Sequence, residues 1–325
     1  MFIAIDKNGR RINILEGLLD GRTSFFCPAC KQELILKQGL IKQAHFAHRS
    51  LTEHCEGTAE AEGPEHLGLK LALYDWVADS ELEVYLPEIQ QTADLLIGER
   101  IAIEIQCSSL SISRLRERTL HYREAEIPVV WLLGERLWLK DRLSRLQEQF
   151  LYFSEQRGFY CWELDLARAC LRLKSLIYQD LQGRLYHLTE EFSFGSRDFL
   201  EVLRIPYIRQ KLQKLPIPEI SDQKAYLERA LYYRSKAWME LQEAYYLQGK
   251  HLLEQDFSRA YLAPPGLNLL ALDAGAERRE FIQLEQDLTA YYENFSQFFH
   301  QEKADFLYPP AYYAIINRKL KREED

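Results

Sequence analysis

The sequence predicts an α/β protein in which a mixed sheet with covering helices lies between a small N-terminal β module and a mostly helical C-terminal domain. Three observations lead to this fold class. Residues 64–133 alternate between helical and strand patterns in the order helix, three strands, helix, strand. Residues 1–58 are rich in short strand-like runs and contain paired cysteines and histidines. From residue 196 onward, apolar side chains recur at helical spacing.

We expect domain boundaries where these patterns change. The predicted units are an N-terminal module over 1–58, a central domain over 59–150, a β meander over 151–195 and a helical domain over 196–325. The chain has 325 residues, of which 47% are hydrophobic, so it is long enough for two or three packed units. The apolar stripes of the last unit are typical of helices that pack on each other, and we expect long helices there over 196–213, about 222–250 and about 275–303, with a short one near 310–321. A further helix is expected over 137–150.

Composition limits the classes of function. No apolar run approaches the roughly 20 residues of a membrane-spanning helix, and the first residues lack the layout of a signal peptide. Six cysteines are too few for a disulfide-stapled fold of this length. We therefore expect a cytoplasmic protein. A net charge of −8 argues against a surface coated with nucleic-acid-binding charge, so any such contact depends on local basic patches.

The most informative stretch is 91–107, QTADLLIGERIAIEIQC, which we interpret as two strands of a hairpin. A loop over 98–100 places Asp94 directly opposite Glu104 and collects the isoleucines on the other face, whereas a two-residue loop would mix the faces. The side chains of directly opposed residues begin about 4.5–5.5 Å apart, and two carboxylates at that distance repel unless a cation neutralises them. We therefore predict a divalent cation such as Mg²⁺, bound by oxygen ligands.

The alternative interpretation is a pair of solvated acids on a polar sheet face. It does not explain why Glu104 lies in the nearly continuous apolar run IAIEIQC, where an unpaired charge is costly. The metal-site interpretation is therefore favoured.

A second candidate site lies in the N-terminal module. A Cys-x₂-Cys pair is followed, after fourteen residues, by a His-x₂-His pair, a spacing that suits a tetrahedral zinc ion. Such an ion would stabilise a unit too small to bury much surface. The expected ligands are Cys27, Cys30, His45 and His48, with His54 and Cys55 as candidates to replace one histidine. The alternatives are unrelated cysteines and histidines, or an intracellular redox site built on Cys27 and Cys30.

Several motifs, taken in order along the chain, resemble one family. They are CPAC and HFAH, PEHLGLK, ADLLI, IAIEIQCSSLSISRLRERTLHY, and VVWLLGERLWLK. Together they are similar to the competence protein CoiA-like family, over most of the chain and most specifically over 1–146. The resemblance implies a role in natural transformation, promoting recombination of imported DNA in the cytoplasm alongside the recombinase.

The central domain also resembles the PD-(D/E)xK nuclease fold, a restriction-endonuclease-like core. The resemblance implies that Asp94 and Glu104 are metal carboxylates and that the backbone carbonyl of Ile105 is a third ligand. Gln106 stands where that fold often has lysine and would orient the attacking water, and Glu65 stands where many members place a further acid. The resemblance assigns supporting roles to His66, Lys70, Ser108, Arg118 and Tyr122.

We therefore predict metal-dependent hydrolysis of DNA, with Mg²⁺ or Mn²⁺ as the catalytic ion, zinc as a structural ion, and single-stranded or branched DNA as the substrate. The second hypothesis is a non-catalytic DNA-binding or recombinase-loading adaptor that retains the fold. DNA contacts should go to phosphates, and exposed Tyr or Phe rings could add stacking on single strands. The candidate basic patches are Arg114, Arg116, Arg118 and Arg123; Arg204, Arg209, Lys211 and Lys214; and Arg318, Lys319, Lys321 and Arg322. The second contains no acid and is the best candidate.

Overall fold

The structure of the chain is a computed structural model. It describes residues 1–17, 24–39, 44–49, 55, 62–98, 100–209, 211–219, 222–257, 260–267, 270, 280–301 and 305–323. The chain divides into two compact units. The first comprises Met1–Trp138, Trp162–Arg172 and Glu191–Leu203, and the second comprises Leu139–Cys161, Leu173–Glu190 and Arg204–Asp325.

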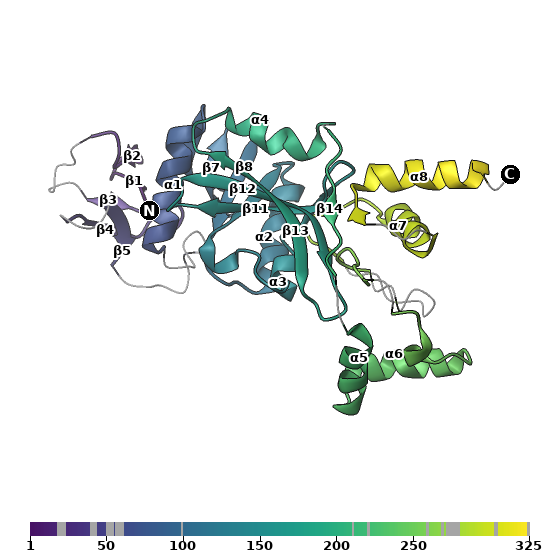
Figure 1. Cartoon of the computed structure of the whole chain (residues 1–325). Helices are drawn as coiled ribbons and strands as arrows, with labels where there is room; N and C mark the ends of the chain where they lie inside the picture. The colour runs from purple at the N-terminus through teal and green to yellow at the C-terminus, as the bar shows by residue number, and fades with distance from the viewer. Residues whose placement is uncertain are drawn as a thin grey trace. The chain divides into compact units, whose positions relative to one another are not determined.

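The N-terminal module is a five-stranded antiparallel sheet, as its short strand-like runs predict (Figure 1). In sheet order the strands are β2 (Arg11–Asn13), β1 (Ile3–Ile5), β3 (Phe25–Phe26), β4 (Glu33–Lys37) and β5 (His45–His48). Phe25, Leu34 and Phe46 form a small buried core with the cysteines Cys27 and Cys55. A core of this size stabilises a fold only slightly, which leaves a role for a bound metal.

The central region follows the predicted order of helix, three strands, helix and strand. Its elements are α1 (Pro64–Trp76), β6 (Ser80–Leu86), β7 (Gln91–Ile97), β8 (Ile101–Gln106), α2 (Ile112–Glu124) and β9 (Val129–Leu133). β6, β7 and β8 pair antiparallel, whereas β8 and β9 pair parallel. The mixed α/β fold is therefore confirmed.

The hairpin of β7 and β8 has the predicted loop and register. Leu95 pairs with Ile103 and Ile97 with Ile101, so the strands are joined through residues 98–100. The left-handed φ of 52° at Gly98 explains why a glycine begins this loop. The observed pairs end at Leu95 and Ile103, and the next residues along the two strands are Asp94 and Glu104, whose charges interact.

The predicted meander extends this same sheet. Its strands are β10 (Tyr152–Ser154), β11 (Gly158–Asp165), β12 (Cys170–Gln179) and β13 (Leu185–Ser193). The strand order is β13-β12-β11-β9-β8-β7-β6, with β10 paired to β11. β11 joins at the free edge of β9, where Trp162 pairs with Leu132 in a parallel register. The sheet that contains Asp94 and Glu104 is thus larger than the predicted central domain.

Two helices carry polar side chains to this sheet. α1 begins with Pro64, whose fixed φ suits the first helical position, and buries Leu67, Leu69, Leu73 and Lys70. α2 begins after Ser111, whose hydroxyl accepts a hydrogen bond from the Arg114 amide, and buries Leu115, Thr119 and Tyr122. The buried faces therefore include Lys70 and Tyr122 among apolar neighbours.

The remaining described helices have between 3 and 14 residues. They are η2 (Glu135–Leu137), α3 (Arg145–Glu148), α4 (Phe199–Arg204), η3 (Ile205–Tyr207), α5 (Gln223–Tyr232), α6 (Lys236–Leu247), η4 (Leu252–Glu254), α7 (Thr289–Gln301) and α8 (Pro310–Glu323). Two short strands, β14 (Leu215–Pro216) and β15 (Phe306–Leu307), pair antiparallel. Within the described residues, no helix has both the length and the apolar character that a membrane crossing requires.

Several helix predictions were too long. The helix predicted over 196–213 ends at Arg204, two residues before Pro206, and the one predicted over 137–150 is reduced to α3. The helix predicted over 222–250 is divided into α5 and α6, because Arg234 adopts a left-handed φ of 52°. The third helix, expected over about 275–303, corresponds to α7 (Thr289–Gln301), and residues 271–279 lie outside the described residues.

Candidate active site and metal-binding cluster

The carboxylates of Asp94 and Glu104 are both buried, at 9% and 2% exposure. β7 supplies Asp94 and β8 supplies Glu104, and the hairpin register brings them to neighbouring positions. Two buried acids whose charges interact destabilise each other unless cations compensate them. The surrounding helices supply those cations.

Asp94 is held by three donors. Its Oδ2 accepts a hydrogen bond from the Ile105 amide at 2.8 Å and from His66 Nε2 at 3.1 Å, while its Oδ1 lies 3.2 Å from Lys70 Nζ. Burial alone would raise the pKa of Asp94, but His66 and Lys70 hold it well below its usual range. Asp94 is therefore ionised. The same contact with Asp94 raises the pKa of His66 against the opposing effect of burial.

Lys70 is 1% exposed and lies among three acids. Its Nζ donates to Glu83 Oε1 at 2.7 Å and to Glu62 Oε1, and it also contacts Asp94. Burial would lower the pKa of Lys70, but these three carboxylates raise it well above its ordinary value. Burial likewise opposes the ionisation of Glu62, yet Lys70 lowers the pKa of Glu62 to about 2. Lys70 is therefore a fixed positive charge and not a proton acceptor.

Glu104 has a different environment. Its Oε1 accepts hydrogen bonds from Arg118 Nη2 and from the Tyr122 hydroxyl, both at 2.6 Å. The Arg118 guanidinium also lies over the Trp131 ring, 5.0 Å from its centroid. Burial raises the pKa of Glu104, and the negative charge of Asp94 adds to that, although Arg118 and Tyr122 oppose it. Glu104 is thus the more easily protonated of the two acids.

The other predicted residues take separate positions. The Gln106 side-chain amide donates to the Ser108 carbonyl at 2.8 Å. Glu65 Oε1 accepts from the Glu135 amide at 2.7 Å, so this acid contacts the turn after β9. Residue 134 beside this carboxylate is a glycine, and a Cβ at that position would lie only 2.9 Å from Glu65 Oε1. The structure thus brings His66, Lys70, Arg118 and Tyr122 to the two acids.

Sequence reasoning missed Glu62 and Glu83. Glu62 ends a stretch that the sequence suggests is an exposed connector, yet its carboxylate joins His66 and Asp94 in a group whose ligand atoms lie within 4.8 Å of one another. Glu83 lies in β6 between Leu82 and Val84, which pair with Leu95 and Ala93. The sequence signal that could have identified Glu83 is an acid between two apolar residues of a strand, at the position that the register places opposite Asp94.

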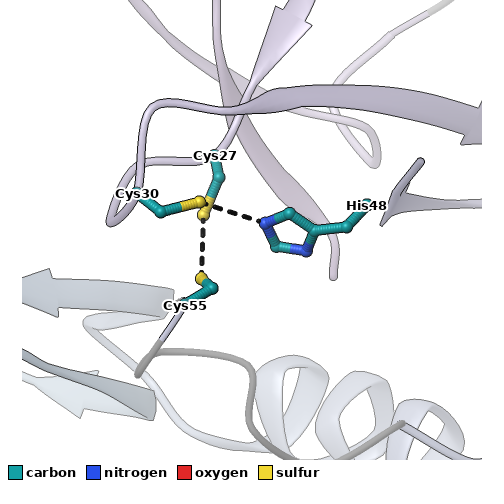
Figure 2. A group of neighbouring side chains, drawn as sticks. All are labelled: Cys27, Cys30, His48 and Cys55. Carbon is teal, nitrogen blue, oxygen red and sulfur yellow. Dashed lines mark hydrogen bonds between the residues drawn. The ribbon is translucent and has the colours of Figure 1, made fainter. Parts of the chain in front are cut away.

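A second cluster lies in the N-terminal module and contains Cys27, Cys30, His48 and Cys55 (Figure 2). Cys30 Sγ lies 3.2 Å from His48 Nε2 and Cys27 Sγ lies 3.8 Å from Cys55 Sγ. All four ligand atoms fall within 4.8 Å of one another, and three thiols with one imidazole are a donor set that suits tetrahedral zinc. Burial raises the pKa of Cys27 to about 12, so a bound cation would be needed to hold this group as a thiolate.

This cluster differs from the predicted Cys₂His₂ set, because it contains Cys55 and not His45. His45 and His48 lie three residues apart in β5, where side chains alternate between the two faces of the sheet. The two histidines therefore cannot both point toward Cys27 and Cys30. His54, the other predicted candidate, lies outside the described residues.

Comparison with known protein families gives two matches along the chain. Residues 62–202 match the family described as "Competence protein CoiA, nuclease-like domain", and residues 13–57 match "Competence protein CoiA, N-terminal domain". The two matches together cover more than half of the chain. The chain belongs to the CoiA-like family of competence proteins.

A relative named "Competence protein CoiA", from Bacillus subtilis (strain 168), is 33% identical to this CoiA-like chain over 168 residues. The match covers 48% of this chain and 44% of the relative, so it spans less than half of that protein's length. No solved structure gives a significant match. The nuclease-like match contains Asp94 and Glu104, and the N-terminal match contains the Cys27 cluster.

The predicted DNA-binding residues of this CoiA-like chain are mostly exposed. Arg114 pairs with Glu117 at 2.8 Å on the surface of α2, which reduces its availability to a phosphate. Arg204, Arg209, Lys211 and Lys214 are exposed, and Lys214 Nζ lies 3.7 Å from the centroid of the Phe306 ring. Of the third patch, the side chains of Lys319, Lys321 and Arg322 lie outside the described residues.

Proposed function

We propose that this protein is a metal-dependent DNA nuclease with a PD-(D/E)xK-type site, acting in recombination of imported DNA during natural transformation. The observation that carries the proposal is the hairpin register that makes Asp94 and Glu104 neighbours, together with the lowered pKa of Asp94. An ionised carboxylate beside a second acid is what a hard divalent cation requires. The nuclease-like family match supports the same conclusion.

Asp94 and Glu104 would hold the ion, with the Ile105 carbonyl as a third ligand. Both hydrogen bonds to Glu104 use Oε1, so Oε2 is the oxygen that we assign to the metal. His66 Nε2, 3.1 Å from Asp94 Oδ2, would be a further ligand if the ion replaced the hydrogen bond between these two atoms, and a nitrogen ligand would favour Mn²⁺ over Mg²⁺. When bound, either ion supplies an activated water and neutralises charge on the phosphate.

The protein side chains supply the rest of the electrostatics. Gln106 carries no charge, and Lys70 places a positive charge beside Asp94 from α1 instead. Since its pKa is raised, Lys70 acts as a permanent cation. Arg118 likewise places a positive charge beside Glu104. This charge makes it less unfavourable for Glu104 to be ionised next to the ionised Asp94.

The test is cleavage of labelled single-stranded and branched DNA with Mg²⁺ or Mn²⁺. Asp94→Asn and Glu104→Gln should each reduce the cleavage rate at least about 100-fold, the scale seen when a preorganised electrostatic group leaves an active site. Glu88→Gln, which changes an exposed acid in the turn after β6, is the matched control and should cut like the parent. If the two site variants cut like the parent, the site assignment is wrong.

One observation favours a second candidate, a DNA-binding or recombinase-loading adaptor that does not cut. Gln106 stands where the PD-(D/E)xK pattern has lysine, and its amide is engaged by Ser108. The adaptor is supported if the parent protein binds DNA but cuts no substrate with either metal. The same proteins and substrates therefore separate the two functions.

We further propose that Cys27, Cys30, His48 and Cys55 bind one structural Zn²⁺ and that the protein works in the cytoplasm beside the recombinase. The closed set of four donors supports a structural and not a catalytic ion. The name of the relative, "Competence protein CoiA", supports this cellular setting. Zinc that stays bound at one equivalent through dialysis would support the first point and dismiss a redox role for Cys27 and Cys30.

A further inference from the structure

Two adjacent tyrosines are among the most exposed large side chains of the described residues. Tyr232 and Tyr233 are 80% and 78% exposed at the turn between α5 and α6. Other tyrosines of the second unit, such as Tyr291 and Tyr313, are 6% and 0% exposed. Exposed neighbouring rings lose the stabilisation that burial gives an aromatic side chain, so they need an explanation beyond folding.

The two rings do not belong to the core of the helix pair. Leu227 of α5 and Leu241 and Tyr245 of α6 are buried, and Tyr226 of α5 contacts Trp238 of α6 edge-on, with ring centroids 6.1 Å apart. Tyr232 and Tyr233 contact each other at right angles, with their centroids 5.1 Å apart. The helix pair therefore has its own apolar contacts, and the tyrosines lie beyond them.

The turn presents these rings on an ordered backbone. The Tyr233 amide donates to the Arg229 carbonyl and the Arg234 amide to the Leu231 carbonyl, both at 2.9 Å. The Ser235 amide closes the turn by donating to Ala230 at 2.9 Å. A fixed turn reduces the conformational entropy that a bound ligand must remove.

Positive side chains are concentrated next to the rings, after the exposed acid Glu228. Residues 229–236, RALYYRSK, contain Arg229, Arg234 and Lys236 and no acid, although the whole chain has a net charge of −8. All three cations are exposed. Lys236 lies 3.8 Å from Glu240, but both side chains are so exposed that this pair is weak. We call residues 229–236 the tyrosine tip.

We propose that the tyrosine tip binds single-stranded nucleic acid, with Tyr232 and Tyr233 stacking on bases and the three cations contacting phosphates. Exposed rings beside positive charge are the combination that binds single strands without reading sequence. A duplex hides its base faces within the stack, so the rings favour single strands. This inference rests on the proposed function for its context, and it narrows the DNA substrate to a strand with unpaired bases.

The experiment measures binding of the full-length protein, without added divalent cation, to a labelled oligothymidylate strand and to a labelled hairpin duplex. The Tyr232→Ala/Tyr233→Ala variant should bind the single strand about 5- to 150-fold more weakly for each stacked base that is lost, with little change on the duplex. The matched control, Tyr232→Phe/Tyr233→Phe, keeps both rings and should bind like the parent. Arg234→Gln should reduce the slope of log K against log salt by about 0.7.

Unchanged single-strand binding by the double alanine variant overturns the inference. Equal losses on strand and duplex also overturn it, because stacking cannot act on paired bases. If sedimentation shows that the parent self-associates and the alanine variant does not, with equal DNA binding, the rings form a contact between copies and the inference again fails. None of these outcomes alters cleavage by the Asp94 and Glu104 variants, so the nuclease proposal is judged separately.

Discussion

The Nζ atom of Lys70 lies 3.2 Å from Oδ1 of Asp94, although the two residues come from different elements, α1 and β7. Because Lys70 also contacts Glu62 and Glu83, a single buried cation balances three acids. The positive charge beside Asp94, the carboxylate that we propose to bind metal, thus comes from helix α1, whereas Gln106 on strand β8 is neutral.

Lys70→Met should lower the free energy of unfolding by about 3–5 kcal/mol, since it leaves buried carboxylates without their partner. Urea unfolding at neutral pH measures the change. Lys140→Met removes an exposed lysine that lies two residues beyond the end of the Met1–Trp138 segment, and it should stay within about 0.5 kcal/mol of the parent. If the Lys70 variant were as stable as the parent, Lys70 would not be needed to balance the buried carboxylates.

Stability should fall in acid partly through Glu62. The pKa of Glu62 is lowered from 4.5 to about 2, against the effect of burial, mainly by Lys70. A carboxyl with a depressed pKa contributes stability that is complete above its unfolded pKa and is lost as pH falls through the folded value. Between these two values the parent should therefore lose stability more steeply than Glu62→Gln. Parallel pH profiles in urea unfolding would refute this assignment.

Metal content should separate the two histidines of β5. His48→Gln and Cys55→Ser should lose zinc on dialysis, because each removes one of four grouped donors. His45→Gln should retain it, since His45 lies three residues from His48 along the strand and points to the other face. Zinc per chain, measured by atomic emission, gives the result. Loss of zinc from the His45 variant would restore the Cys₂His₂ set.

Gly134→Ala should destabilise the protein by about 1–3 kcal/mol, the usual effect of inserting a methyl group into a packed site. A Cβ at Gly134 would lie 2.6 Å from Cys107 Sγ and 3.1 Å from the Cys107 Cα, so backbone would have to move. Gly39→Ala is the control, because a Cβ there meets nothing within 4 Å. Thermal unfolding of both variants tests the difference, and matching melting temperatures would show that the site relaxes freely.

Alternating side chains made the hairpin predictable. In 91–107 a slip of one residue would mix acids with isoleucines, so the sequence itself selects the register that pairs Leu95 with Ile103. The same reasoning applied to His45 and His48 would have excluded one of them. The Cys-x₂-Cys and His-x₂-His spacing predicted zinc ligands without regard to the alternation of side chains along a strand.

Contacts between elements were not predictable in the same way. Lys70 meets Glu83 only because α1 packs on the sheet, and helix packing depends on side chains far apart in sequence. The break between α5 and α6 lacks glycine and proline, and the left-handed residue is Arg234. Without a turn residue, the apolar stripe of 222–250 indicated one helix where there are two.

Glu83 has a consequence for how the chain could be divided. This residue has a left-handed φ of 48°, is 4% exposed, and accepts hydrogen bonds on Oε2 from the amides of Phe2 at 2.7 Å and Ile3 at 3.0 Å. A fragment that starts after residue 58 would leave this oxygen buried without those donors, at a cost of about 1–3 kcal/mol or more for a charged group. The first residues of the chain are therefore a structural part of the nuclease-like region, because their amides satisfy a buried acid of β6 in the same compact unit.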